Sequence, residues 1–337
     1  MIGRVSLARP VAHDTVNLVI QNHFAEERAE PLPSHSFVLT YDVGGSHVNA
    51  GLCRLSDLQI LRIAGADHKS IDTFEGFADL LHRLGVEAVA GETDVAGASL
   101  AVPGPFDLVA GMSQMEHKLT YLKGKSLRNA LAERFGWTPD RLRFLNDAAA
   151  YVLGEVGAGS LKGAHRAVGL TLGTGVGCAF VVEGRAVVTG PGVPRGGEIW
   201  DFPYAGGIVE DLISTRRIKA DYAALAGTER EVADIASSAP TDANARRVFE
   251  DFGLRLGDVL RNVIAPFQPQ MVMIGGGISR SSQLFLPFTE EHLHGLTFRV
   301  VTSALLDRAP LAGAGQFWRE ESTVAESAGG GRLIEPA

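Results

Sequence analysis

Cysteine is scarce in this sequence: the 337 residues include two, Cys53 and Cys178. Two cysteines can supply neither a multi-disulfide framework nor a four-cysteine zinc site, and both lie in apolar, strand-like runs, so we expect buried and reduced thiols. The sequence also lacks the roughly 20 consecutive apolar residues of a membrane span and the apolar core of a signal peptide. These absences predict a cytoplasmic protein without a membrane partner.

An excess of positive charge is absent as well, because the formal net charge is -8 at pH 7. This balance disfavours nucleic acid as a partner, although an anionic nucleotide could still bind through local backbone amides and a metal ion. Glycine, by contrast, is abundant: the chain has 40, many of them in short clusters. These clusters indicate binding sites that are built from backbone groups.

Strand and helix patterns alternate along most of the chain and occur in two similar halves. Each half opens with a strand, a glycine turn and a second strand, FVLTYDVGGSHVNAGLCRL in the first and AVGLTLGTGVGCAFVVEGR in the second. Amphipathic helices and further buried strands follow each hairpin. The order predicts an α/β protein with a small lobe at residues 36–146, a large lobe at 147–320 and a ligand cleft between the lobes.

The boundaries of several segments can be predicted from local signals. Residues 1–35 are expected to form an N-terminal extension with a short helix around 15–28, and residues 321–337 a flexible tail. A helix is expected to end at Gly85, and another to begin after the N-cap Ser126 and to end before Gly136. The last helix, within residues 309–320, could return to the first lobe.

Two glycine turns are candidates for phosphate binding. In the first, Asp42 ends a strand, and the backbone N–H groups of the turn could form a concave site for an anion; the turn residues are Gly44, Gly45 and Ser46. A simple hairpin turn explains the same residues equally well. In the second, with Gly173, Thr174 and Gly175, a strand follows where a dinucleotide fingerprint would require a helix. A second phosphate-binding hairpin is therefore favoured.

Two further junctions carry candidate residues. Asn146 and Asp147 stand where a buried strand meets a helix of small residues, and an acid at a helix N-terminus stays ionised. By local context alone, a plain helix cap is the favoured interpretation. Glycines at 275–277 (Gly275, Gly276 and Gly277) follow a buried strand and would let a ribose or a ring approach the backbone, or would simply form a tight turn.

An acidic segment, RGGEIWDFPYAGGIVEDLIS, places four carboxylates among aromatic residues and glycines: Glu198, Asp201, Glu210 and Asp211. Ionised carboxylates accept hydrogen bonds from hydroxyl groups, which suits sugar recognition. Acids on a solvated surface loop are the alternative, and the spacing by itself favours sugar binding only slightly.

The order of these motifs, together with AVPGPFD, resembles the ROK family of sugar kinases and repressors, over about residues 37–317. The resemblance implies an actin/hexokinase-type (ribonuclease H-like) fold that uses ATP and Mg²⁺ to phosphorylate a hexose, glucose-like or an N-acetylhexosamine. It further implies that Asp147 is the catalytic base, that Asn146, Glu198 and Glu210 bind the sugar, and that Asp42 positions Mg²⁺ through water. The glycine turns would hold phosphates, and residues 275–277 would hold the adenosine.

The sequence departs from the family at two places. Asp201 stands where the family usually has a zinc-binding histidine, and PYAGGIVED replaces the cysteine cluster. We therefore expect no zinc and expect Asp201 to take over part of the sugar contact. Lys118 stands where the family often has a sugar-contacting asparagine, so the identity of the sugar stays open.

Two other classes of function remain as alternatives. ROK-type regulators and sugar sensors carry an N-terminal DNA-binding domain, for which residues 1–35 are too few and not basic. A non-kinase ATPase of the same fold would not need carboxylates that face a polyol, whereas Asn146, Asp147 and Glu198 form such a set. The resemblance also allows a homodimer.

Overall fold

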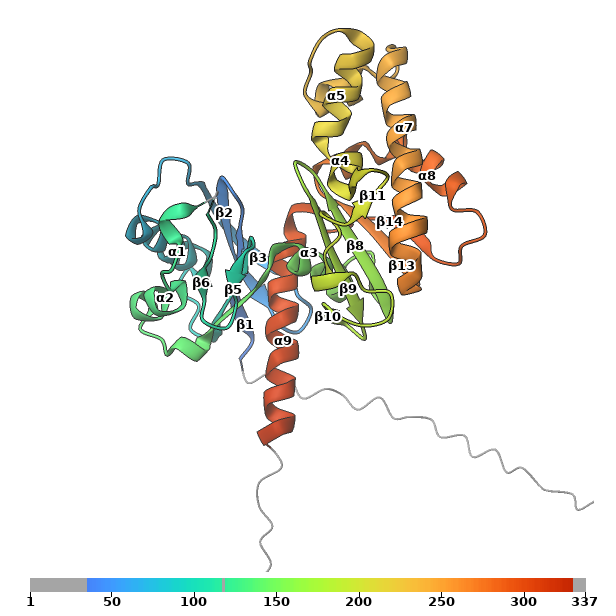
Figure 1. Cartoon of the computed structure of the whole chain (residues 1–337). Coiled ribbons are helices and arrows are strands. Elements are labelled where there is room, and N and C mark those ends of the chain that lie inside the picture. The colour runs from blue at the N-terminus through green and yellow to red at the C-terminus, as the bar shows by residue number, and fades with distance from the viewer. Residues whose placement is uncertain (1–34, 117–118, 330–337) are drawn as a thin grey trace, which may run out of the picture. The chain divides into compact units, whose positions relative to one another are not determined.

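The computed structural model describes residues 35–116 and 119–329 (Figure 1). Apart from His35, the N-terminal extension with its expected helix around 15–28 lies outside the described residues, as do Lys118 and residues 330–337. In the described part, no helix is long and apolar enough to cross a membrane.

Two five-stranded sheets organise the described residues. The strands of the first sheet are, in spatial order, β3 (Ile60–Asp67), β2 (His47–Arg54), β1 (Phe37–Val43), β4 (Val95–Val102) and β7 (Leu142–Asn146). Those of the second sheet are β10 (Arg185–Val187), β9 (Val176–Val182), β8 (Arg166–Leu172), β13 (Met271–Gly275) and β14 (Arg299–Thr302).

The two sheets share one pattern of strand directions. In the first, β1, β2 and β3 form an antiparallel meander, and β4 and β7 run parallel to β1. In the second, β8, β9 and β10 form the meander, and β13 and β14 run parallel to β8. Each of the two predicted strand–glycine turn–strand units thus opens one of the two sheets.

Helices and two short hairpins complete the described part (Figure 1). The α-helices are α1 (Phe74–Val89), α2 (Leu127–Phe135), α3 (Asp147–Ala158), α4 (Val209–Ile213), α5 (Thr215–Ala226), α6 (Val232–Ser238), α7 (Ala243–Val259), α8 (Leu286–His292) and α9 (Ala309–Gly329). The short hairpins pair β5 (Phe106–Asp107) with β6 (Met112–Ser113), and β11 (Pro203–Tyr204) with β12 (Gly207–Ile208).

The first sheet is covered on both faces. Successive side chains of a strand point to opposite faces, and along β1 the residues Leu39 and Tyr41 pack with α1 and α2. Val38, on the other face, packs with Leu311 and Trp318 of α9. Helix α9, the last of the described helices, therefore covers one face of the first sheet.

Helices α3 and α9 cross with their backbones in contact. A Cβ atom on Gly313 would clash with the carbonyl oxygen of Ala150, and a Cβ atom on Gly154 would clash with that of Ala309. Glycine is therefore required on both helices at the crossing. Helix α9 continues to Gly329, so residues 321–329, which were expected to begin the flexible tail, are helical.

The predicted end of α1 at Gly85 is wrong. The helix ends at Val89, and Ala90 adopts a left-handed conformation (φ 48°) whose N–H donates to the carbonyl of Val86. Gly85 lies inside the helix, at a position that requires glycine because a Cβ atom there would clash with the hydroxyl oxygen of Tyr41. For α2, by contrast, the predicted cap Ser126 and the terminal Gly136 (φ 66°) are both confirmed.

Both cysteines are buried and free, as the sequence predicts. Burial raises the pKa of the Cys53 thiol to about 12, and burial, followed by the negative charge of Glu198, raises the pKa of the Cys178 thiol. Both side chains are therefore protonated core residues at neutral pH.

Candidate active site

The junction of β7 and α3 separates the roles of two adjacent polar residues. Asn146 has extended backbone angles, and its Oδ1 accepts a hydrogen bond from the N–H of Ala149 at 3.1 Å, so it is the N-cap. Asp147 is the first residue of the helix, and its Oδ1 accepts from the N–H of Ala148 at 2.8 Å. The positive end of the helix dipole favours its ionised form.

Asp42 and Asp147 come from different strands of the first sheet and meet at one edge. Asp42 pairs with Ala101 of β4, and the next residue of that strand, Val102, pairs with Asn146 of β7. Because the strands are parallel, their carboxyl ends lie together. The sheet therefore brings the two predicted acids to the same place.

The electrostatics of Asp42 reflect this neighbourhood. Burial, together with the negative charges of Asp147 and Asp307, raises the pKa of its carboxyl to about 6, while His47 and a hydrogen bond with Asn49 oppose the rise. A cation at this edge would relieve the repulsion. Within the described residues, no three His, Cys, Asp or Glu side chains converge on one point. Mg²⁺ usually keeps several waters and needs only one or two carboxylates. The carboxylates of Asp42 and Asp147 at this edge therefore fit Mg²⁺.

The first glycine turn is a closed hairpin. The N–H of Gly44 donates to the carbonyl of His47 at 2.9 Å, and the N–H of His68 donates to the carbonyl of Ser46 at 3.0 Å. The ring Nε2 of His68 lies 3.0 Å from the carbonyl oxygen of Gly44. A Cβ atom on Gly45 would meet nothing within 4 Å, so this glycine faces open space.

The second glycine turn is held by α5 and by Glu210. The N–H of Gly173 donates to the carbonyl of Gly175 at 3.0 Å, and the N–H of Thr215 donates to the carbonyl of Gly173 at 2.8 Å. Oε2 of Glu210 accepts a hydrogen bond from the N–H of Val176 at 3.2 Å. Glu210, predicted as a sugar ligand, thus has one oxygen against the second glycine turn.

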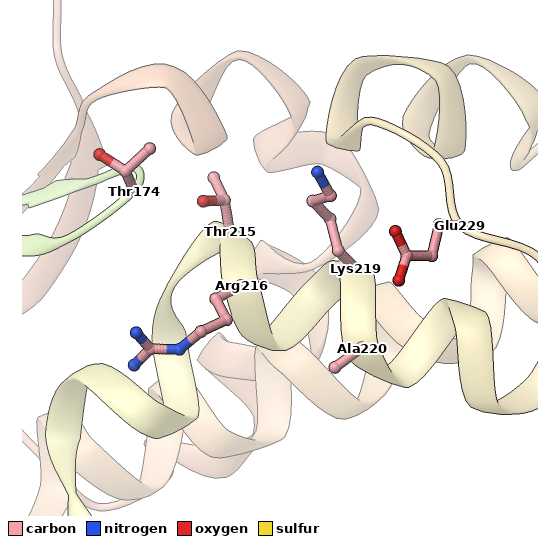
Figure 2. A pocket seen from close by; sticks show the side chains of 6 residues that line it. All are labelled: Thr174, Thr215, Arg216, Lys219, Ala220 and Glu229. Carbon is pink, nitrogen blue, oxygen red and sulfur yellow. The ribbon is translucent and has the colours of Figure 1, made fainter.

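A hollow of about 420 Å³ opens beside the second glycine turn (Figure 2). Thr174 lies at its edge, and the first turns of α5 supply Thr215 and Lys219. The whole lining is Thr174, Thr215, Arg216, Lys219, Ala220 and Glu229. Of these, Thr174 alone is predicted from the sequence; the run TRRIK, with three cations in five residues, is the available signal for the others.

The two cations of this hollow also have carboxylate partners. Nζ of Lys219 lies 2.6 Å from Oε1 of Glu231, and Nη2 of Arg216 lies 2.9 Å from Oδ1 of Asp211. Both pairs involve exposed groups, and such pairs are worth little in water. An anion that entered the hollow could therefore compete for either cation.

The third glycine cluster lies beside the second turn. Gly275 ends β13 in register with Thr171 of β8, and Gly276 has a φ of 79°. A Cβ atom on Gly276 would lie 2.5 Å from the carbonyl oxygen of Leu172, and one on Gly275 would lie 2.6 Å from the ring of Tyr151. Glycine at these positions keeps the backbone close to β8 and to α3.

The acidic segment is open to solvent at two of its predicted sugar ligands. Glu198 and Asp201 are both exposed. Oε2 of Glu198 accepts a hydrogen bond from Nε1 of Trp200 at 2.7 Å. Oδ2 of Asp211 accepts one from the N–H of Ile208 at 3.3 Å, at the start of α4.

Comparison with known proteins gives a consistent set of similarities. The model of the ROK family matches residues 38–321. A glucokinase of Thermotoga maritima is 27% identical over 83% of this chain and 96% of its own length. An N-acetyl-D-glucosamine kinase of Aliivibrio fischeri is 26% identical over 73% of this chain and 85% of its own.

Solved structures resemble the chain in fold. A ROK hexokinase from Thermus thermophilus superimposes with a TM-score of 0.69 at 22% identity, covering 87% of this chain and 99% of that one. A ROK transcriptional regulator, described as a homolog of E. coli MLC, gives 0.71 at 21% identity, covering 88% of this chain and 81% of that one. The predicted actin/hexokinase-type fold is confirmed.

Proposed function

Because this chain belongs to the ROK family, we propose that it is an ATP-dependent sugar kinase in which Asp147 is the general base. The observation that carries the proposal is the division of roles at the start of α3. Asn146 caps the helix, so the carboxylate of Asp147 is not needed for that purpose. It lies instead at the sheet edge where its charge reaches Asp42.

The proposed reaction is an in-line transfer of the γ-phosphoryl group. Asp147 accepts the proton of a sugar hydroxyl while the hydroxyl oxygen forms a bond to the γ-phosphorus and the bond from phosphorus to the β,γ-bridging oxygen breaks. Such transfer depends mainly on positioning and on stabilisation of charge. A Mg²⁺ ion near Asp42 would supply neutralisation of the phosphate charge, and the residue would position it through water.

We assign the donor nucleotide to the glycine turns. The turn at Gly44–Ser46 and the turn at Gly173–Gly175 would hold phosphates through backbone N–H groups other than those of Gly44 and Gly173, which close the hairpins. Lys219, in the hollow beside Thr174, adds a cation that suits the same anionic ligand. The backbone at residues 275–277 would accommodate the adenosine, since a Cβ atom on Gly277 would face open space that glycine leaves to a ribose.

We assign the acceptor sugar to Asn146 and the acidic segment. Glu198 and Asp201 are exposed and ready to accept hydrogen bonds from hydroxyl groups. Glu210 would contact the sugar with Oε1, because its Oε2 accepts from Val176. The substrate class is a hexose, glucose-like or an N-acetylhexosamine, in keeping with the relatives.

A coupled assay of ADP release across a panel of hexoses and N-acetylhexosamines tests the proposal. Sugar-dependent release that falls with Asp147→Asn supports a kinase. Release that is independent of sugar would indicate an ATPase. Sugar binding without ADP release would indicate a sensor or regulator.

A further inference from the structure

A fully buried carboxylate lies two turns along α3 from Asp147 and has no place in the reaction described above. The side chain of Glu155 is 0% exposed. Its partners are all hydrogen-bond donors. To Oε1 these are Ser303 Oγ (2.6 Å) and the N–H of Leu305 (2.8 Å), and to Oε2 the N–H of Ser160 (2.7 Å), Ser160 Oγ (3.0 Å) and the N–H of Ala304 (3.1 Å).

This set of donors suits a carboxylate and no other side chain of the same length. A carboxylate accepts at both oxygens, whereas the amide of glutamine would turn two N–H groups toward donors. Removing a buried charge from water has a large cost unless its hydrogen bonds are satisfied. The complete satisfaction of Glu155 indicates a fixed position in the fold.

The hydrogen bonds of Glu155 continue to the third glycine cluster. Oγ of Ser303 donates to Glu155 and accepts from Oη of Tyr151 at 2.9 Å. The same Oη lies 3.5 Å from the N–H of Gly276. The N–H of Ser303 donates to the carbonyl of Ile274, the residue before the cluster, at 3.0 Å.

Three residues of one helix are thus placed at connected points. Asp147 begins α3, Tyr151 lies one turn later against Gly275, and Glu155 lies one turn beyond that. A shift of the glycine cluster relative to Asp147 would have to break this series of contacts.

We propose that Glu155 is a positioning residue for the donor nucleotide: through Ser303 and Tyr151 it fixes the backbone at residues 275–277 relative to Asp147. The inference rests on the proposed function and deepens it, because it names what holds the adenosine-binding segment in register with the base.

Two substitutions interrupt the series, and a third serves as a matched control. Tyr151→Phe keeps the ring against Gly275 and removes Oη. Ser303→Ala removes the hydrogen bond to Glu155, the link to Tyr151 and the acceptor of the Leu306 N–H. Ser160→Ala removes one hydrogen bond to the same carboxylate at its other oxygen, away from the glycine cluster.

The measurements are the Kd for ADP by calorimetry, the KM for ATP, the KM for the sugar and the melting temperature. Tyr151→Phe and Ser303→Ala should raise the ADP Kd and the ATP KM by roughly 3- to 30-fold, the usual range for one lost hydrogen bond, and should leave the sugar KM unchanged. Ser160→Ala should lower the melting temperature, by less than Ser303→Ala does because it removes fewer hydrogen bonds, and should leave the ADP Kd within about 2-fold.

Equal effects of Ser303→Ala and Ser160→Ala on the ADP Kd would overturn the inference, as would no effect of Tyr151→Phe and Ser303→Ala. A wild-type chain that binds ADP and phosphorylates no sugar would overturn the proposed function alone, because the effect of the variants on the ADP Kd would still test the role of the glycine cluster. A wild-type chain that binds no nucleotide would overturn both.

Discussion

Asn146 caps helix α3, and Asp147 follows it as the first helical residue. The 3.1 Å hydrogen bond from the N–H of Ala149 to Asn146 Oδ1 anchors the start of the helix. The chemistry proposed for Asp147 can therefore be separated by mutation from the stability of the helix.

For Asp147→Asn we expect a fall in kcat of roughly 10²- to 10⁴-fold, the usual worth of a general base. The melting temperature and the sugar Kd should change little, because the cap remains. Asn146→Ala is the informative comparison, since loss of an N-cap costs about 1 kcal/mol. A purified Asp147→Asn protein that turns over at nearly the wild-type rate would show that Asp147 is not the base.

Asp42 should make stability depend on pH. Its folded-state pKa of about 6 exceeds the ordinary value of 3.8, so the folded protein holds this proton more tightly than the unfolded chain does. The resulting stabilisation is complete below pH ~3.8 and is lost as the pH rises through about 6. Above about pH 6 the folded state therefore carries the unfavourable charge of a buried, ionised Asp42.

Asp42→Asn removes this titration. The difference in the free energy of unfolding, variant minus wild type, should increase by about 1–3 kcal/mol when the pH is raised from ~4 to ~8. Kinase activity should fall. Urea unfolding at the two pH values, without nucleotide or metal, measures the difference. A constant difference between variant and wild type at both pH values would contradict the raised pKa.

Lys219→Gln should raise the KM for ATP by roughly 3- to 10-fold, because the hollow loses one cation in reach of an anionic ligand. The sugar KM should stay the same. Arg247→Gln is the control: Arg247 pairs with Asp251 on α7 and does not line the hollow. If both variants behave alike, the hollow does not take part in binding the donor.

Glu198→Gln should raise the KM for every sugar, since a charge-assisted hydrogen bond is worth about 1.5–3 kcal/mol. Asp201→Asn should instead change the ranking among epimers and N-acetyl sugars, with the ATP KM nearly constant. Steady-state kinetics over a sugar panel compare the two. An unchanged ranking for Asp201→Asn would mean that Asp201 is a solvated turn residue without a sugar contact.

The purified protein should hold no stoichiometric zinc, because Asp201 stands at the position of the family's histidine and the cysteine cluster is replaced. Elemental analysis after dialysis is the measurement. About one zinc per chain, removed by a chelator together with a fall in melting temperature, would refute this interpretation of the segment.

Local signals in the sequence predicted those features that local structure determines. Helix α2 begins after Ser126 and ends before Gly136 as expected. The hydrogen bonds of both caps are made within the helix itself, so neighbouring residues are enough to predict them. The two strand–glycine turn–strand units were equally clear. Six motifs in a fixed order then identified the family, which no single motif could do.

Features that depend on contacts across the fold were missed. Gly85 was predicted to end a helix, but glycine stands there because Tyr41 leaves no room for a side chain. Lys219 belongs to a hollow whose other edge comes from residue 174, far away in the sequence. The sequence carries no local signal for the contacts of Glu155, since its partners at 303–305 become neighbours only when β14 pairs with β13.

The contact of α3 with α9 restricts how the protein could move. At Gly154 and Gly313 the two backbones touch without side chains between them, so neither helix can slide along the other without a steric clash. The first part of α9 contacts α3, and Trp318, further along, packs on the first sheet. Val152 of α3 packs on the second sheet, so we expect a rearrangement of one sheet against the other to be a rotation about this crossing, with the two glycines at its axis.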